Sequence, residues 1–412
     1  MPAPKKAAKK VAKKGAKKVV EAPKTKEAAF EAQLASVGLA SALRVADTYD
    51  NNYEVVTSGW PGVDRLISDF KDLQGIPKEC HMEIFSEVEH VGKTSFTLAI
   101  GVTWQKLGYR VGIVDIEPSV TIAYLKQLGY ITDKAEAEKL GLYAVRLLQP
   151  QVKAEECETD MVYVDKVLDT VSIAANYFDF LIVDSVDALV SEADAAKTTT
   201  ENTQMGGVSK QIKAFFRKNG KRRASIAWVN HMSQGLGQYA KSYTTGGKAL
   251  PRYSSIRFRI DRVDFIRPND DADPIGFISK ISLVKNRLGP IGRATLLYYI
   301  FGEGFSVDYD YFLTAKKLGI INAKGAWVYY GKDKDDSKLT VQGVHNMYLT
   351  LKTERRDLFD EIKGIIDGVD VEPEILEEEV NAEDLFDGME VEEDDEAETE
   401  AAEPAAADSA AA

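Results

Sequence analysis

The segment that most constrains this chain is a short loop that ends in Gly92, Lys93 and Thr94. A short apolar run ending at Phe85 predicts a strand before the loop, and residues 96–104 predict an amphipathic helix after it. A loop between a strand and a helix suits phosphate groups, because backbone N–H groups and the helix N-terminus attract an anion. The lysine would reach phosphate oxygens and the threonine hydroxyl would bind Mg²⁺. The pattern therefore predicts a P-loop.

The match to the P-loop pattern is incomplete at its first glycine. Five positions before Gly92 the chain has Glu87, and Ser86 takes the glycine position only if the loop is one residue longer. Glycine fits there because the backbone turns tightly and approaches an anion, whereas a carboxylate facing phosphates would repel them. The motif alone leaves nucleotide binding open, and its context has to decide.

The net charge of −13 is distributed unevenly over the 412 residues. Residues 1–30 hold ten lysines and two glutamates, a charge of +8, and residues 370–412 hold nineteen acidic residues without Lys or Arg, a charge of −19. The residues between them therefore carry only −2, which predicts a nearly neutral globular body between two charged tails. The basic tail is interpreted as a disordered solubilising segment, with a non-specific arm for nucleic-acid phosphates as the alternative.

Cysteine usage and hydropathy argue against several classes of protein. Cys80 and Cys157 are too few for a disulfide framework, and with four scattered histidines they show no zinc-ligand spacing. No apolar run approaches the roughly 18–20 residues of a membrane span, and the N-terminus lacks the apolar core of a signal peptide. These features predict a protein of the reducing cytoplasm.

Two further predicted strands end in acidic residues. One covers residues 110–115, and the other, residues 180–184, runs through four apolar residues into Asp184. Strands that alternate with helices imply parallel β-α-β units, which bind ligands at the carboxyl ends of their strands. Asp184 therefore fits a Walker B aspartate, which holds the hydration shell of Mg²⁺. Glu117, two residues beyond Asp115, falls at the same rim, either as a solvated side chain or as a catalytic one.

Two stretches later in the chain have the composition of loops. Residues 191–206 are polar with little periodicity, and residues 232–247 are rich in glycine. Long loops inside a compact domain are functional or disordered. A predicted helix between them carries Lys210, Lys213 and Arg217 on roughly one side.

The order of these features is more specific than any one of them. In chain order they are Thr57-Ser58-Gly59, Glu83-Ile84-Phe85, Gly92-Lys93-Thr94, Val114-Asp115-Ile116-Glu117, Ala123-Tyr124-Leu125, Leu128-Gly129, residues 181–189, Met205-Gly206, Trp228-Val229-Asn230, Thr244-Thr245-Gly246-Gly247, Ala249-Leu250, Val284-Lys285-Asn286-Arg287 and Gly302-Glu303-Gly304-Phe305. This succession resembles the RecA family of homologous recombinases over roughly residues 30–365, in a divergent version such as bacteriophages carry.

The resemblance implies an ATPase with ATP and Mg²⁺ as cofactors. The catalytic residues would be Glu117, Lys93 and Asp184, with Glu117 polarising the attacking water. Thr94 and Asp184 would be the metal ligands. Tyr124 would stack on adenine, with a half-buried helix aromatic as the alternative reading. The full set that the resemblance assigns to the nucleotide is Val91, Gly92, Lys93, Thr94, Ser95, Tyr124, His231, Lys285 and Arg287.

The resemblance also implies a filament on single-stranded DNA that pairs it with a homologous duplex. Residues 192–206 and 232–247 would be DNA-binding loops, and sequence-independent contacts suit this task because base pairing supplies the specificity. Lys285 and Arg287 would reach ATP on the neighbouring protomer. Implied partners are single- and double-stranded DNA, further copies of the chain, and single-strand-binding and loader proteins, with no membrane. The residues assigned to DNA are Met205, Gly206, Lys210, Arg217, Gly246 and Gly247.

The implied fold is α/β, with a RecA-like P-loop ATPase core on a mainly parallel central sheet, an N-terminal helical segment and a small α+β C-terminal domain. Residues 327–330 predict a strand of that last domain. In the family an acidic tail tends to restrain duplex-DNA binding, and simple solvation is the alternative. The expected segments are a basic disordered tail at 1–27, an oligomerisation segment and linker at 28–77, the core at 78–308, the C-terminal domain at 309–368 and an acidic disordered tail at 369–412.

Three positions depart from the family pattern. Besides Glu87 or Ser86, His231 replaces a glutamine that senses the γ-phosphate, and Arg252 replaces an aromatic residue at the protomer contact. An imidazole can also donate a hydrogen bond, with a strength that depends on pH. The leading hypothesis is a DNA-dependent ATPase and strand-exchange recombinase in a bacterial or phage-infected cytoplasm. The alternatives are a filament that binds single-stranded DNA and uses ATP as a switch with little or no hydrolysis, and a ring helicase on the same core.

Overall fold

In the computed structural model the described residues are Ser36, 54–150, 163–191, 207–219, 224–233, 242–267 and 273–368. Of the expected oligomerisation segment and linker at 28–77, residues 28–53 lie outside them apart from Ser36, and so do both charged tails. The chain divides into two compact units, residues 1–52 and 53–412. All of the labelled helices and strands belong to the second unit.

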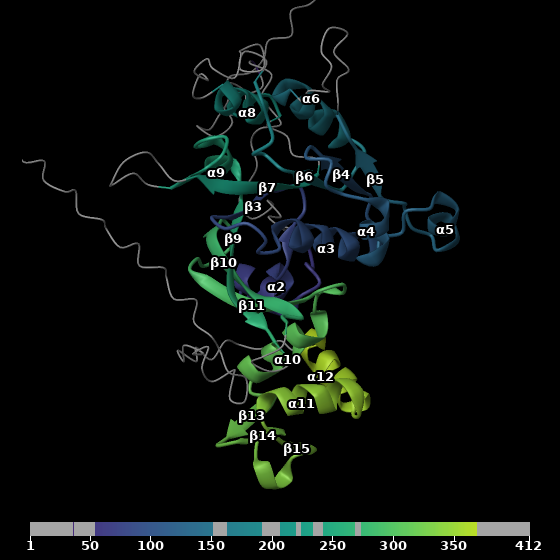
Figure 1. The fold of residues 1–412 in the computed structure, drawn as a ribbon, viewed down its shortest axis with the longest axis vertical. Coiled ribbons are helices and arrows are strands. Elements are labelled where there is room, and N and C mark those ends of the chain that lie inside the picture. Colours follow the sequence, from purple (N-terminus) through teal and green to yellow (C-terminus); the bar gives the residue numbers. More distant parts are fainter. Residues whose placement is uncertain are drawn as a thin grey trace, which may run out of the picture. The chain divides into compact units, whose positions relative to one another are not determined.

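A ten-stranded sheet lies at the centre of this unit (Figure 1). The strand order is β12-β11-β10-β9-β3-β7-β6-β4-β5, with β8 paired to β7. Neighbours from β9 to β5 are parallel, whereas β9 to β12 pair antiparallel, as does β8. The predicted parallel core is confirmed, with an antiparallel wing added. The strands are β3 His81–Ser86, β4 Val111–Asp115, β5 Arg146–Leu148, β6 Phe180–Asp184, β7 Ser225–Ser233, β8 Tyr243–Thr244, β9 Ile256–Ile266, β10 Gly276–Asn286, β11 Arg293–Ile300 and β12 Gly304–Phe305.

Strands β4 and β6 consist of apolar residues up to their terminal aspartates, because both faces of the sheet are covered. In β6, Phe180 and Ile182 join one hydrophobic cluster, whereas Leu181 and Val183 join another on the opposite face. This is the two-residue periodicity of a strand. On the first face lie α2 (Pro61–Ile67), α3 (Lys93–Lys106) and α4 (Ile122–Gln127), and on the other α6 (Val164–Ala174), α8 (Gly207–Lys218) and α9 (Ala249–Tyr253).

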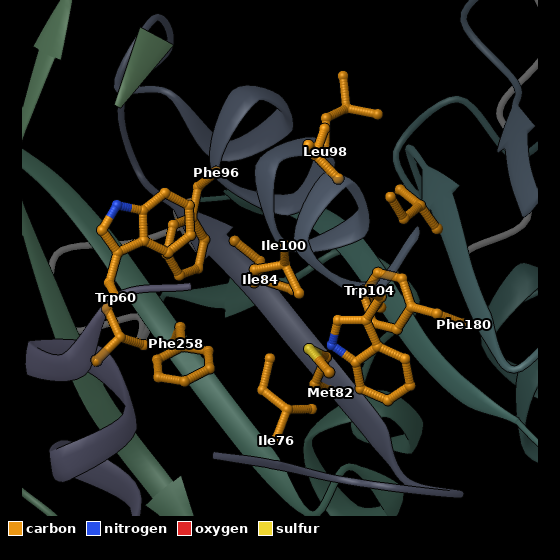
Figure 2. Packing of buried hydrophobic residues seen from close by; sticks show 14 of the residues in the cluster. Trp60, Ile76, Met82, Ile84, Phe96, Leu98, Ile100, Trp104, Phe180 and Phe258 are labelled. Carbon is orange, nitrogen blue, oxygen red and sulfur yellow. The ribbon is translucent and has the colours of Figure 1, made fainter. Parts of the chain in front are cut away.

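Helix α3 corrects one expectation. Residues 96–104 predicted an amphipathic helix, but across Lys93–Lys106 only Lys106 is exposed. The helix lies over the sheet, and its apolar side chains are covered on several sides (Figure 2). The Trp60 ring stacks on Phe96 with centroids 5.4 Å apart, and Trp104 lies 4.8 Å from the Phe180 ring. A helix buried on most sides has no polar stripe to reveal its period.

The C-terminal elements pack around another hydrophobic cluster, which includes Phe312, Met347 and Phe359 and extends to side chains of β9, β10 and β11. They comprise α10 (Val307–Lys317), α11 (Val344–Thr353), α12 (Arg356–Gly368) and a three-stranded antiparallel sheet of β13 (Ile321–Lys324), β14 (Trp327–Tyr330) and β15 (Leu339–Gln342). The predicted strand at 327–330 is confirmed. Smaller elements are β1 (Val55–Val56), β2 (Ile76–Pro77), α5 (Lys134–Lys139) and the 3₁₀ turns Lys71–Leu73 and Lys334–Asp336. Within the described part of the chain, no helix has both the length and the apolar character needed to cross a membrane.

A buried carboxyl group joins α10 to α2. The Gly62 N–H donates to Asp310 Oδ2 at 2.8 Å, and a Cβ on Gly62 would lie 2.3 Å from Asp310 Oδ1. Asp310 is 1% exposed. Burial raises its pKa from 3.8 to about 7, against the lowering effect of the Gly62 hydrogen bond and of Lys317.

Replacing Asp310 with asparagine is expected to change how stability depends on pH. The folded protein binds the Asp310 proton more tightly than the unfolded chain, so its stabilising contribution is complete below pH 4 and is lost as pH rises towards 7. Stability of Asp310→Asn relative to wild type should therefore rise over that window, by at most about 1.4 kcal/mol per pH unit. Urea unfolding from pH 4.5 to 7.5 measures this. Asp357→Asn, at an exposed carboxyl whose pKa Arg355 lowers, should run parallel to wild type, and a parallel Asp310→Asn curve would refute the prediction.

Candidate functional site

The loop between β3 and α3 has the geometry expected of a P-loop. Gly92 precedes the first helical residue, Lys93, and has a φ of +90°. A Cβ there would lie 2.7 Å from the Phe305 ring, so glycine is required by both conformation and space. Val91 is buried, and its carbonyl accepts a hydrogen bond from Ser279 at 2.9 Å. Because the first N–H groups of a helix have no acceptor within the helix, those at the start of α3 can face an anion.

The structure accommodates the missing first glycine in a specific way. Ser86 is the last residue of β3, and its hydroxyl accepts from the Val88 N–H at 3.0 Å and donates to the Val88 carbonyl at 2.8 Å. The Glu87 carboxylate lies 3.5 Å from the Arg259 guanidinium and accepts from Ser242 at 3.5 Å. The expected repulsion between Glu87 and phosphates is therefore reduced by a neighbouring cation.

The Lys93 ammonium group lies in the loop. It donates to the Val88 carbonyl at 3.2 Å and lies 3.4 Å from His231 Nδ1, at the end of β7. Burial lowers the pKa of Lys93, and nearby carboxylates, Asp184 foremost, raise it. Burial and then Lys93 lower the pKa of His231, which favours the neutral imidazole, whose Nδ1 can accept from the ammonium in the matching tautomer.

Asp184 and Thr94 form the candidate metal site. Asp184 is 3% exposed at the end of β6, and burial raises its pKa to about 6, although a hydrogen bond from Thr94 lowers it. Its buried Oδ2 has no hydrogen-bond partner within the described residues. A carboxylate oxygen in need of a partner beside a hydroxyl suits Mg²⁺. In the described ranges no group of three or more His, Cys, Asp or Glu could hold a metal, so the other ligands would be water and phosphate.

Glu117 lies beyond β4, at the same edge of the sheet as Asp184. Its side chain is exposed, and its Oε1 accepts a hydrogen bond from the buried hydroxyl of Ser185. Asp115 is buried instead and takes a structural role. The donors to its carboxylate are the Ser119 N–H at 3.2 Å, the Val120 N–H at 3.4 Å and the Gln149 amide at 3.0 Å.

Aromatic side chains lie beside the start of α3. The Tyr124 hydroxyl is 2.7 Å from Ser95 Oγ, and burial raises the pKa of Tyr124 to about 12. This half-buried position joins Tyr124 to the P-loop helix and leaves its role in base stacking a prediction. Gln127 at the end of α4 donates to the Gly302 carbonyl at 2.5 Å, next to Phe301, whose side chain is 50% exposed.

Lys285 and Arg287 lie at the end of β10 and contact α9. Lys285 Nζ donates to the carbonyls of Pro251 (2.6 Å) and Arg252 (3.0 Å), and Arg287 donates to the Arg252 carbonyl at 2.9 Å. Cations at a helix C-terminus satisfy its unpaired carbonyls. These contacts hold both cations against α9.

The residues assigned to DNA divide into three groups. Met205 and Gly206 lie outside the described residues. Lys210 and Arg217 are exposed on α8. Gly246 and Gly247 have φ values of +82° and +68°, and added Cβ atoms would lie 2.7 Å from Ile212 and 2.6 Å from Ser209. The end of the second stretch therefore packs on the helix that carries the cations.

Asn230 connects this packing to the P-loop strand. Its amide donates to Glu83 in β3 at 2.9 Å and to the Thr245 carbonyl at 3.0 Å, while its oxygen accepts from the His231 N–H at 2.8 Å. Arg257 in β9 donates to the other oxygen of Glu83 at 2.6 Å. This buried network connects the end of β7, where His231 lies beside Lys93, to the segment of Gly246 and Gly247 that packs against α8.

Comparison with known proteins identifies the family. Residues 24–306 match the family model of the RecA N-terminal domain. The chain belongs to the RecA family. Similar RecA proteins are those of Campylobacter jejuni subsp. jejuni (29% identity, covering 83% of this chain and 92% of the relative) and Geobacter sulfurreducens (29%, 70% and 79%). A RadB recombinase structure covers 60% of this chain and 97% of its own, with a TM-score of 0.40 and 17% identity.

The RecA-family fold brings together several residues that the sequence analysis did not single out. Ser185 contacts Glu117, Arg259 contacts Glu87, and Phe301 lies beside the turn that binds α4. Two of these residues had a signal in the sequence. Ser185 directly follows the Walker B aspartate, and Phe301 directly precedes Gly302-Glu303-Gly304. Nothing in the sequence pairs Arg259 with Glu87.

The glycine that returns the second loop to α8 is expected to tolerate no side chain. Gly246→Ala should destabilise this RecA-family protein by about 1–3 kcal/mol, because a left-handed backbone and a contact at 2.7 Å both oppose the added Cβ. Urea unfolding monitors the change. Gly364→Ala, in α12 with no atom within 4 Å of the added Cβ, should instead stabilise by about 0.5–1 kcal/mol. Equal effects at both glycines would contradict the assignment.

Proposed function

We propose that this chain is a DNA-dependent ATPase that forms filaments on single-stranded DNA and promotes homologous pairing and strand exchange in the cytoplasm. One observation carries the proposal. In this RecA-family chain, five polar side chains lie together where β3, β4, β6 and β7 end, namely Lys93, Thr94, Glu117, Asp184 and His231. A cation, a hydroxyl, two carboxylates and an imidazole at the carboxyl ends of parallel strands suit phosphoryl transfer from ATP.

The P-loop side chains would bind the triphosphate. The Lys93 ammonium would exchange its contacts with Val88 and His231 for phosphate oxygens, and His231 would then be free to contact the γ-phosphate. Thr94 and Asp184 would hold Mg²⁺, which neutralises charge that develops on the phosphates. Glu117 would accept a proton from the attacking water.

The aromatic residues beside α4 would form the base site. Tyr124 presents a ring beside Ser95, and the half-exposed Phe301 adjoins the turn that Gln127 holds. Aromatic rings with one free face suit stacking on a nucleobase. Lys285 and Arg287 would act on ATP held by the neighbouring protomer, with α9 as the element that positions them.

Exposed cations on α8 would contact DNA phosphates. The packing of Gly246 and Gly247 on α8 supports this, because it makes the loop end and the cationic helix one continuous unit. The network through Asn230 would then relate the state of the nucleotide site to the position of that unit.

The test is ATP turnover with and without single-stranded DNA, followed by strand exchange with a homologous duplex. Turnover stimulated by DNA together with strand exchange is the expected result. DNA binding that depends on ATP without turnover would favour a switch-like filament, which the altered P-loop motivates. Unwinding of a forked duplex without strand exchange would favour a ring helicase.

A further inference from the structure

Glu117 is held by one side-chain hydrogen bond in the described part of the chain. β4 and β6 are adjacent parallel strands, and Asp115 is level with Asp184 in their register. Glu117 comes two residues after Asp115, and Ser185 comes directly after Asp184. Both therefore lie at the same edge of the sheet. The Ser185 hydroxyl, on a residue only 1% exposed, donates to Glu117 Oε1.

The direction of this carboxylate is otherwise little constrained. Glutamate has three side-chain torsions, and Glu117 is exposed to solvent. Asp115 differs, since two backbone N–H groups and one amide fix it. The buried hydroxyl of Ser185, in contrast, belongs to the residue that directly follows β6, so it provides a fixed point of contact for an exposed side chain.

We propose that Ser185 is a positioning residue for Glu117, holding Oε1 so that Oε2 faces the nucleotide. The inference rests on the ATPase activity proposed above. In the reaction, Oε2 takes a proton from water, the water oxygen bonds to the γ-phosphorus, and the bond from that phosphorus to the bridging oxygen breaks to release ADP and phosphate. Ser185 exchanges no proton in this scheme. Its contribution is the fraction of time that Glu117 spends in a productive orientation.

Ser185→Ala is expected to lower kcat for ATP by about 10–100-fold, because a displaced base costs a factor of this order. KM for ATP and ATP-dependent DNA binding should stay within about twofold, since neither depends on the direction of Oε2. Ser185→Thr keeps the hydroxyl and should restore kcat to within about threefold of wild type. The matched control is Ser225→Ala, which removes a buried hydroxyl that donates to the Pro77 carbonyl at 2.9 Å, at the opposite end of β7, and should leave kcat unchanged.

A double-mutant cycle makes the test independent of folding effects. In a Glu117→Gln background, Ser185→Ala should cause no further loss of the residual turnover, because the group that it positions is already inactive. Three outcomes would each overturn the positioning role of Ser185. They are an additional loss in the Glu117→Gln background, an unchanged kcat in Ser185→Ala alone, and equal losses in the alanine and threonine variants at equal melting temperatures. A wild type without turnover would overturn the ATPase proposal and this role together, whereas turnover that ignores Ser185 overturns only the role.

Discussion

Glu117→Gln is expected to reduce ATP turnover by about 10²–10⁴-fold, the usual contribution of a general base. The amide has the shape of the carboxylate and can still accept the Ser185 hydrogen bond, but it cannot take a proton from water. Nucleotide binding should persist, because removing a negative charge near Lys93 would not weaken the attraction between Lys93 and the phosphates. DNA binding that depends on ATP should therefore survive the loss of turnover.

The measurement is phosphate release at saturating ATP and single-stranded DNA, alongside DNA binding by fluorescence anisotropy. Glu138→Gln is the control, because this exposed carboxylate on α5 pairs only with Lys134 one turn away within the described residues. Its turnover should equal that of wild type. Undiminished hydrolysis by Glu117→Gln would remove Glu117 from the role of base.

The second large effect is expected for Lys93→Ala, which should abolish ATP-dependent filament formation and weaken ATP binding by at least about 10²-fold, a loss of roughly 2.7 kcal/mol. Lys93 is 6% exposed, and its ammonium group lies among carboxylates that include Asp184 and Glu117. Without it, those carboxylates would repel the phosphates with no opposing cation at the start of α3.

Titration with a fluorescent ATP analogue and electron microscopy of DNA with ATP measure the two effects. Lys106→Ala, at the exposed opposite end of α3, is the matched control and should bind ATP normally. Filaments that form unchanged with Lys93→Ala and ATP would contradict the assignment of Lys93 to the phosphates.

Local patterns in the sequence predicted the framework of the site. The strands ending at Asp115 and Asp184, the P-loop after Phe85 and the strand at residues 327–330 are all present. Each is a short-range signal, in which a run of apolar or aromatic residues is bounded by polar residues or glycine. The RecA-family fold, which the order of these signals implied, is confirmed.

What the sequence could not supply are the contacts between distant segments. The prediction of an amphipathic helix at residues 96–104 was wrong. An alternation of apolar and polar residues with the helical period marks a helix with one solvent-exposed face, and α3 has almost no exposed face. The position of Ser185 after the Walker B aspartate indicates that it lies at the site, but its pairing with Glu117 depends on the register of β4 and β6, which no local pattern encodes. The roles of the site residues, the segment boundaries, the functions of the two tails and the bacteriophage origin stay predictions.

The contact between Glu87 and Arg259 has a consequence for how this chain can change during evolution. β3 and β9 are adjacent strands, and Phe85 pairs with Arg259 in their register. The arginine therefore lies beside the point where the P-loop begins after β3. Losing Arg259 alone would leave a carboxylate unshielded next to the phosphates, and restoring glycine at position 87 alone would leave Arg259 with Asp261 as its partner. The two positions are therefore expected to covary among close relatives. Variant libraries built on this chain should mutate them as a pair.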